Sequence, residues 1–147
     1  LGHQTMAREP SSQSLTAFDG DTFSQNGQVI RIWGIDAPEL KQKCTINGIS
    51  YACGEVSKAY LKSLLSENDV ECISMPKSSF ETRTVSKCYI QTHDLGQMMV
   101  SSGWAIDYTY FSKGEYEKQE NLAKAEHRGI WSGEFESPYE WRKRHKK

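Results

Sequence analysis

The alternation of hydrophobic and polar positions predicts a β-hairpin in the first third of the chain. Residues 28–33 alternate strictly, so Ile30 and Ile32 fall on the same face of a strand. The Asn-Gly dipeptide at residues 26–27 is typical of a two-residue hairpin turn, and residues 14–23 before it alternate more loosely. We therefore expect two antiparallel strands joined by a tight turn.

Further along, the spacing of apolar residues changes from strand-like to helical. Two more strands are predicted, at residues 69–75 and 84–91. Helices are predicted at residues 54–65, 95–102 and 115–127, with a short final helix that opens at Ser137-Pro138. Residues 40–53 are expected to form a polar loop. This order of elements predicts an α+β domain with a small antiparallel barrel.

The length of 147 residues is that of a single globular domain. Hydrophobic residues make up 37% and aromatic residues 11%, which argues against an intrinsically disordered protein. No apolar run approaches the ~18 residues of a membrane-spanning helix, so we do not expect a membrane protein. We expect a disordered segment at residues 1–11, a folded domain at residues 12–142 and a basic tail at residues 143–147.

The net charge of −1 hides an uneven distribution of charged residues. Five of the 18 basic residues lie in the last six positions, so residues 1–141 carry 13 basic and 19 acidic side chains. A protein that binds nucleic acid through bulk charge would be basic throughout. Any polyanion would therefore be held by a few well-placed cations, with help from the tail or from a metal ion.

The spacing of the four cysteines favours disulfide bonds over a zinc site. Cys44, Cys53, Cys72 and Cys88 allow three pairings, and they contain no Cys-x-x-Cys knuckle of the kind usual in structural zinc sites. An even number of cysteines in a small domain suits an oxidising compartment. The alternative is four unrelated buried thiols in a cytosolic protein.

Charged residues in strand and turn contexts gather in three places. The first is Asp19-Gly-Asp-Thr22, the second runs from Arg31 to Glu39, and the third is Arg83. Two acids on adjacent strands can converge on one hard cation, and a guanidinium group can bind a phosphate through two hydrogen bonds. Taken singly, segments of this kind are more often a plain turn or a surface ion pair.

Taken together, these segments resemble the staphylococcal nuclease (thermonuclease) family, from about Leu15 to Trp141. The matching blocks are Asp19-Gly-Asp-Thr22, Arg31-Ile-Trp-Gly-Ile-Asp-Ala-Pro-Glu-Leu40, Tyr51-Ala-Cys-Gly54, Gly103-Trp-Ala105, Arg128-Gly-Ile-Trp131 and Pro138-Tyr-Glu-Trp-Arg142. The presence of cysteines is similar to the secreted or periplasmic bacterial members of this family.

The resemblance implies a fold and an activity. The fold is a five-stranded antiparallel OB-fold barrel with about three helices. The activity is calcium-dependent endonucleolytic hydrolysis of DNA and RNA at the P–O5′ bond, which leaves 3′-phosphate ends, by a secreted or periplasmic monomer. The residues at the matching positions are the calcium ligands Asp21, Asp36 and the Ala37 carbonyl, the general base Glu39, the phosphate-binding Arg31 and Arg83, and the substrate contacts Tyr108 and Tyr110.

The chain departs from the family before Arg83. The family usually has an Asp-Arg/Lys-Tyr-Gly-Arg run, whereas this chain has Ser79-Phe-Glu-Thr-Arg83. Glu81 adds a negative charge near a polyanion site, so we expect weaker activity than in relatives with the usual turn. The alternative function is a nucleic-acid-binding or scaffolding OB module with weakened or lost catalysis.

Two disulfide bonds are expected, Cys44–Cys53 and Cys72–Cys88. The first pair would bracket one polar loop, and the second would join two neighbouring antiparallel strands. A disulfide requires Cα atoms within roughly 7 Å of each other, which adjacent strands provide.

Overall fold

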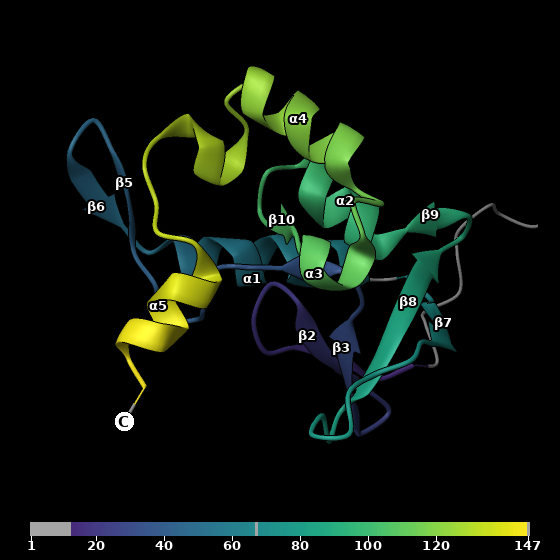
Figure 1. The fold of residues 1–147 in the computed structure, drawn as a ribbon. Helices are drawn as coiled ribbons and strands as arrows, with labels where there is room; N and C mark the ends of the chain where they lie inside the picture. The colour runs from purple at the N-terminus through teal and green to yellow at the C-terminus, as the bar shows by residue number, and fades with distance from the viewer. Residues whose placement is uncertain (1–12, 67, 147) are drawn as a thin grey trace, which may run out of the picture.

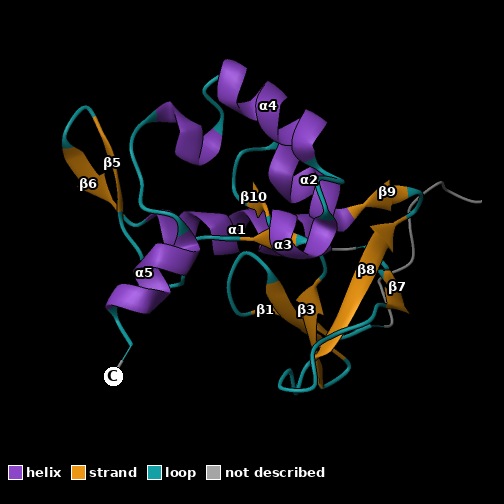
Figure 2. Cartoon of the chain, in the orientation of Figure 1, coloured by secondary structure: helices purple, strands orange, loops and turns teal. Residues whose placement is uncertain are grey.

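The computed structural model describes residues 13–66 and 68–146, so the segment expected to be disordered, residues 1–11, lies outside the described residues. The described residues form an α+β fold (Figures 1 and 2). The strands are β1 Leu15–Ala17, β2 Thr22–Gln25, β3 Gln28–Ile32, β4 Ile35–Asp36, β5 Cys44–Ile46, β6 Ile49–Tyr51, β7 Glu71–Ser74, β8 Thr84–Ile90, β9 His93–Asp94 and β10 Ile106–Asp107. The helices are α1 Cys53–Leu65, α2 Leu95–Ser101, α3 Thr109–Ser112, α4 Glu117–Ala125 and α5 Pro138–Arg144, with a 3₁₀ turn at Gly129–Ser132.

The main sheet is mixed, which corrects the expectation of a five-stranded antiparallel barrel. Its strand order is β1-β2-β3-β8-β7, with β9 also paired to β8, and over the described residues it does not close into a barrel. Most pairs are antiparallel, but β3 and β8 run parallel, with Arg31 opposite Val85. Parallel neighbours need a long crossover, and the chain between β3 and β8 provides one that contains α1.

The predicted hairpin is confirmed as β2 and β3. Gln25 pairs with Gln28 across a two-residue turn, in which Asn26 and Gly27 both have positive φ angles, 51° and 86°. The predicted loop at residues 40–53 is partly wrong, because it contains a second hairpin, β5–β6. The turn of this hairpin is again an Asn-Gly dipeptide, in which Asn47 and Gly48 have φ angles of 52° and 77°.

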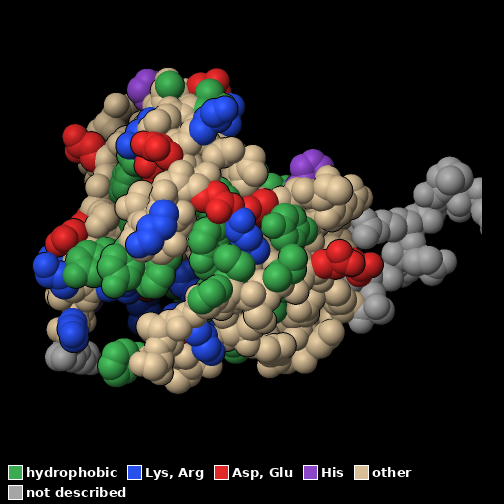
Figure 3. All heavy atoms as spheres, turned by 45° about the vertical axis from the view of Figure 1, so that its right-hand side comes forward, with side chains coloured by type: hydrophobic (Ala, Val, Ile, Leu, Met, Phe, Trp, Pro, Cys, Tyr) green, Lys and Arg blue, Asp and Glu red, His purple; other side chains and the backbone are tan. Residues whose placement is uncertain are grey.

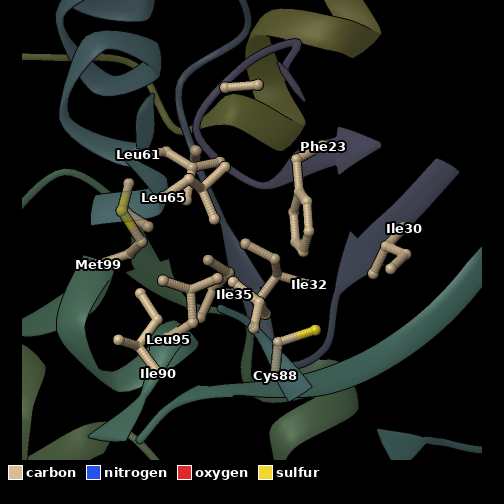
Figure 4. Close-up of a cluster of buried hydrophobic side chains, with 14 of the residues drawn as sticks. Phe23, Ile30, Ile32, Ile35, Leu61, Leu65, Cys88, Ile90, Leu95 and Met99 are labelled. Carbon is tan, nitrogen blue, oxygen red and sulfur yellow. The ribbon is translucent and has the colours of Figure 1, made fainter. Parts of the chain in front are cut away.

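The hydrophobic core lies between the main sheet and the helices. Ile30 and Ile32 on β3 are both buried, as the alternation predicts, and Phe23 on β2 lies beside them (Figure 4). Leu61 of α1 and Met99 of α2 cover the sheet in the same cluster. Burial of these apolar side chains fixes the ends of β2, β3 and β4, from which the candidate site is built.

The described residues contain five helices rather than about three, and the short helix α3 was not predicted. The third predicted helix is shorter than expected, because α4 ends at Ala125 and His127 turns the chain with a φ of 55°. The final helix is longer, since α5 continues through Arg144 into the segment expected to be a tail. Ser137 caps α5 as predicted, accepting a hydrogen bond from the Glu140 N–H at 3.1 Å. None of the described helices is long and apolar enough to cross a bilayer.

Both expected disulfides are confirmed. Cys44 and Cys53 tie the β5–β6 hairpin to the first residue of α1, with Cα atoms 5.6 Å apart. Cys72 and Cys88 face each other on the antiparallel strands β7 and β8, with Cα atoms 4.0 Å apart. The cysteines in this chain are therefore structural, and none is free.

Candidate functional site

Hairpin pairing brings the first acidic turn next to Arg31. Thr22 pairs with Arg31 across β2 and β3, and the Ile32 N–H donates to the Asp21 carbonyl at 2.8 Å. Asp21 therefore comes to lie beside the Arg31 side chain. Gly34, with a φ of 80°, then turns the chain from β3 into β4, which ends at Asp36.

Arg31 lies between two buried carboxylates. Its Nη1 is 3.6 Å from Asp21 Oδ2, and its Nη2 is 3.7 Å from Asp36 Oδ1. Asp21 is 5% exposed and Asp36 is 1% exposed. Although Asp21 belongs to a turn, β2, β3 and the Ala37 backbone enclose its side chain. A buried carboxylate needs partners, and these two share one guanidinium group.

Hydrogen bonds hold the Asp21 carboxylate in a fixed orientation. Its Oδ1 accepts from the Thr22 hydroxyl at 2.9 Å, and its Oδ2 accepts from the Ala37 N–H at 2.8 Å. Residue 37 thus lies against Asp21, and Asp36 precedes it in the chain. Two carboxylates and a backbone carbonyl nearby are hard oxygen donors, so the donor set fits a calcium ion. No group of three or more His, Cys, Asp or Glu side chains among the described residues forms a metal site by itself.

Burial and charge move the pKa values of the three aspartates in different directions. Burial, with the neighbouring Asp21 charge, raises the pKa of Asp19 to about 7. Burial also raises the pKa of Asp36 to about 6, although hydrogen bonds from Arg142 oppose this. Burial acts in the same direction on Asp21, but the Arg31 charge and hydrogen bonds outweigh it and lower the pKa of Asp21.

The loop after β4 places Glu39 beside these aspartates. The Glu39 N–H donates to Gln42 Oε1 at 3.0 Å, and the buried Gln42 in turn donates to the Glu136 carbonyl at 2.6 Å. Gly54 at the start of α1 packs on the same loop, where a Cβ atom would lie 1.9 Å from the Glu39 carbonyl oxygen. Only glycine therefore allows α1 to approach this loop so closely.

Arg142 completes the cluster, although no role was predicted for it from the sequence. Its Nη1 donates to Asp36 Oδ1 at 2.9 Å and to Glu39 Oε2 at 2.7 Å, and its Nη2 donates to Asp36 Oδ2 at 3.1 Å. Arg142 is 106 residues from Asp36 in the chain, so no local spacing could reveal this contact. The only signal was the Pro138-Tyr-Glu-Trp-Arg142 block, to which the resemblance gave no function.

Arg83 belongs to the same region but is engaged elsewhere. Its Nε donates to Glu81 Oε2 at 2.7 Å, its Nη2 donates to Glu81 Oε1 at 2.8 Å, and its own N–H donates to Glu81 Oε2 at 2.8 Å. Arg83 is near enough to the acidic turn that the charges of Asp21 and Asp19, after the Glu81 hydrogen bond, help to raise its pKa. The structure therefore brings Arg31, but not Arg83, into direct contact with the aspartates.

The two tyrosines expected to contact substrate have different positions. Tyr108 lines a pocket next to Arg31, together with Trp33, Glu81 and Phe111. Tyr110 is 72% exposed and lies outside this lining, with its ring edge-on to Phe111 at 4.9 Å. Phe111 is thus a pocket residue that the sequence analysis did not identify. Figure 3 shows a hollow at the lower left of the view, with basic side chains inside it and hydrophobic side chains above it.

Known proteins match most of the chain. Residues 29–133 match the family described as staphylococcal nuclease homologue. A succinoglycan biosynthesis protein, ExoI, of Rhizobium meliloti (strain 1021) is 29% identical over 138 residues, which are 92% of this chain and 72% of that protein. Two probable staphylococcal-like nucleases of Oryza sativa subsp. japonica, CAN2 and CAN3, are 32% and 33% identical over 116 residues, or 78% of this chain.

The match to the rice proteins covers only part of their length. The chain spans 29% of CAN2 and 28% of CAN3, so it corresponds to one region of these longer proteins. The family match, in contrast, contains Arg31, Asp36 and Glu39 and extends through most of the described fold. The chain therefore belongs to the family of staphylococcal nuclease homologues.

Proposed function

We propose that this protein is a calcium-dependent endonuclease that hydrolyses the P–O5′ bond of DNA and RNA and leaves 3′-phosphate ends. The observation that supports this most strongly is a cluster of three carboxylates and two arginines, in which Asp21 and Asp36 lie beside Arg31, and Asp36 and Glu39 are bridged by Arg142. A protein that only binds nucleic acid has no need for a cluster of three carboxylates among the cations that would hold its phosphate.

In the proposed reaction, Glu39 is the general base. Its Oε2 is held by Arg142, and Oε1 remains to accept a proton from the attacking water. The water oxygen forms a bond to phosphorus, the P–O5′ bond breaks, and O5′ leaves with a proton from solvent. The 3′ side keeps the phosphate.

Arg31 has the position to stabilise charge in this reaction. Its guanidinium is fixed by a hydrogen bond from Nη1 to the Ile32 carbonyl at 2.9 Å and by the two aspartates. Negative charge builds up on the non-bridging oxygens as water attacks, and a fixed donor there costs no reorganisation. Arg83 would add a second guanidinium only after its separation from Glu81.

Asp21, Asp36 and the Ala37 carbonyl would hold the calcium ion. Bound there, calcium would neutralise the charge of the phosphate and make the attacking water easier to deprotonate. Asp19, whose side chain accepts the Asp21 N–H at 3.0 Å, would orient water in the surrounding shell. Tyr108 would contact the nucleotide in the adjoining pocket, and the exposed Tyr110, which packs on Phe111, would contact it outside the pocket lining.

We also propose that the protein works as a monomer in an oxidising compartment, secreted or periplasmic. The two disulfide bonds support this location, because structural disulfides are rare in a reducing cytosol.

One observation favours the alternative function, a binding module with weakened catalysis. Glu81 occupies the guanidinium of Arg83 through both of its oxygens, which leaves the pocket-lining Arg31 as the arginine proposed to bind phosphate. The enzyme is still the better supported function, because Glu39 and the buried aspartates serve no purpose in a binder.

A nuclease gel distinguishes the two functions. The protein is run unreduced, refolded in gels that contain DNA or RNA, and incubated at alkaline pH with calcium or with a calcium chelator. We expect cleared bands with calcium and none with the chelator. Binding of DNA in a mobility-shift assay without clearing at saturating calcium would favour the binding module.

A further inference from the structure

Arg142 links the last helix to the candidate catalytic carboxylates. Three of its N–H groups are used, two on Asp36 and one on Glu39, at distances between 2.7 and 3.1 Å. Charge-assisted bonds of this kind are the strong ones, and a planar guanidinium fixes the relative orientation of the groups that share it. The two carboxylates are thus held together by one side chain of α5.

A second contact fixes α5 on the same loop. The buried Gln42 side chain accepts from the Glu39 N–H and donates to the Glu136 carbonyl, two residues before the helix begins. In Figure 1, α5 lies on the side of the molecule that carries the β5–β6 hairpin, and Glu134 pairs with Thr45 of β5. The position of Arg142 therefore follows from the packing of the segment before α5.

The neighbouring basic residues of α5 make no such contact. Lys143 lies 4.0 Å from Glu140 and Arg144 lies 2.8 Å from Glu136, and both side chains are more than 60% exposed. The Arg142 side chain is 35% exposed, and the Asp36 side chain that it binds is 1% exposed. Arg142 alone among these three cations is directed into the cluster.

We infer that Arg142 is a positioning residue, which holds Glu39 for proton transfer and acts as the resident counter-cation of Asp36. This inference rests on the proposed function. Loss of Arg142 should therefore have opposite effects on the rate of cleavage and on the affinity for calcium. Without Arg142, Glu39 loses its orientation, and cleavage slows. Without Arg142, Asp36 also loses a positive neighbour, and a calcium ion no longer has to share that carboxylate with a guanidinium.

The test compares Arg142→Ala, Arg142→Lys and the control Lys143→Ala with the wild-type protein. Calcium alone is titrated by calorimetry, without nucleic acid, and kcat and KM are measured on a DNA oligonucleotide. For Arg142→Ala we expect calcium binding on the order of tenfold tighter, because one nearby positive charge is gone. We expect its kcat to fall at least about tenfold with KM little changed.

The other two variants separate charge from geometry. Arg142→Lys keeps the positive charge but cannot bridge two carboxylates, so it should bind calcium as the wild type does and still show the lower kcat. Lys143→Ala removes a cation from the adjacent position and should match the wild type in both measurements. Circular dichroism of each variant checks that the fold is intact. If Arg142→Ala does not fold, the kcat of Arg142→Lys tests the positioning of Glu39 instead.

Arg142→Ala that matches Lys143→Ala in calcium affinity and in kcat would overturn the inference. Weaker calcium binding in Arg142→Ala would overturn the counter-cation role. A wild-type protein that never cuts would refute the proposed nuclease activity and the positioning of Glu39, whereas the calcium titration would still decide the role of Arg142 at Asp36.

Discussion

At the scale of single residues, Glu81 sets this chain apart from the turn expected before Arg83. The Glu81 carboxylate, in the same loop, binds the Arg83 guanidinium in a bidentate geometry. An arginine binds phosphate in the same way. A phosphate bound by Arg83 would therefore have to displace Glu81. The negative charge of Glu81 alone predicts a weaker site, and the structure adds a direct contact with Arg83.

Glu81→Gln should increase the activity. The substitution removes the negative partner of Arg83, so the guanidinium can turn toward a phosphate, and we expect kcat/KM on DNA to rise by about three- to tenfold. Steady-state cleavage of an oligonucleotide measures this. Glu117→Gln, on the exposed first turn of α4, is the matched control. Equal rates for the two variants would show that Glu81 does not restrain Arg83.

The same pair predicts a pH dependence of stability. The Arg83 hydrogen bond lowers the pKa of Glu81 from 4.5 to about 2. Because the pKa is lower in the folded state, the pair stabilises the fold above pH 4.5, and this contribution is lost as the pH falls toward 2. Both groups are partly exposed, so we expect less than about 1 kcal/mol.

Urea unfolding of the wild-type protein and Glu81→Gln at pH 7 and pH 3 measures this contribution. The free energy of unfolding of the wild type should exceed that of the variant at pH 7, and the difference should shrink at pH 3. A difference that grows at pH 3 would contradict the lowered pKa of Glu81.

At the scale of elements, turn dipeptides and alternation predicted the strands well, but they could not predict long-range pairing. Asn26-Gly27 marked the β2–β3 hairpin, and Asn47-Gly48 marked β5–β6, which the polar sequence around it concealed. The parallel pairing of β3 and β8 depends on the crossover between them, in which α1 packs on the core, and packing of that kind leaves no periodic signal.

The two disulfides should stabilise their elements to different degrees. The Cys72–Cys88 bond spans 16 residues and joins neighbouring strands, and the Cys44–Cys53 bond spans 9. In the chain-entropy model, the longer loop contributes about 3 kcal/mol and the shorter one somewhat less.

Paired Cys→Ser variants, unfolded in urea, test this order. Loss of Cys72–Cys88 should reduce the free energy of unfolding more than loss of Cys44–Cys53. Loss of Cys44–Cys53 should also slow DNA cleavage, because that bond anchors the start of α1, where Gly54 packs on the Glu39 loop. Unchanged cleavage in Cys44→Ser/Cys53→Ser would show that Glu39 is held without the disulfide.

At the scale of the whole molecule, the candidate site combines three distant parts of the chain. The sequence predicted the residues that lie close to one another in it, namely Asp21, Arg31, Asp36 and Glu39. It could not predict Arg142, which reaches the site only through the packing of α5 against the loop after β4. It also could not show that Arg83 is turned to Glu81, because that depends on the local shape of one loop.

The uneven charge of the chain has a structural counterpart. Residues 1–141 are acidic overall, and the described structure gathers Asp21, Asp36 and Glu39 around Arg31 and Arg142. The last six residues supply Arg142 to the site rather than only a solvated tail. A polyanion would thus meet a few fixed guanidinium groups, in agreement with the absence of a large basic excess.

The most direct test of the proposed catalysis is the single-turnover cleavage rate of Glu39→Gln at saturating calcium, compared with the wild type and with Glu55→Gln on the exposed first turn of α1. The amide keeps the size of the side chain but cannot accept the proton of the attacking water. We predict that Glu39→Gln cleaves DNA at least about 10²-fold more slowly, whereas Glu55→Gln cleaves at the wild-type rate. Cleavage by Glu39→Gln at the wild-type rate, with 3′-phosphate products, would contradict the account.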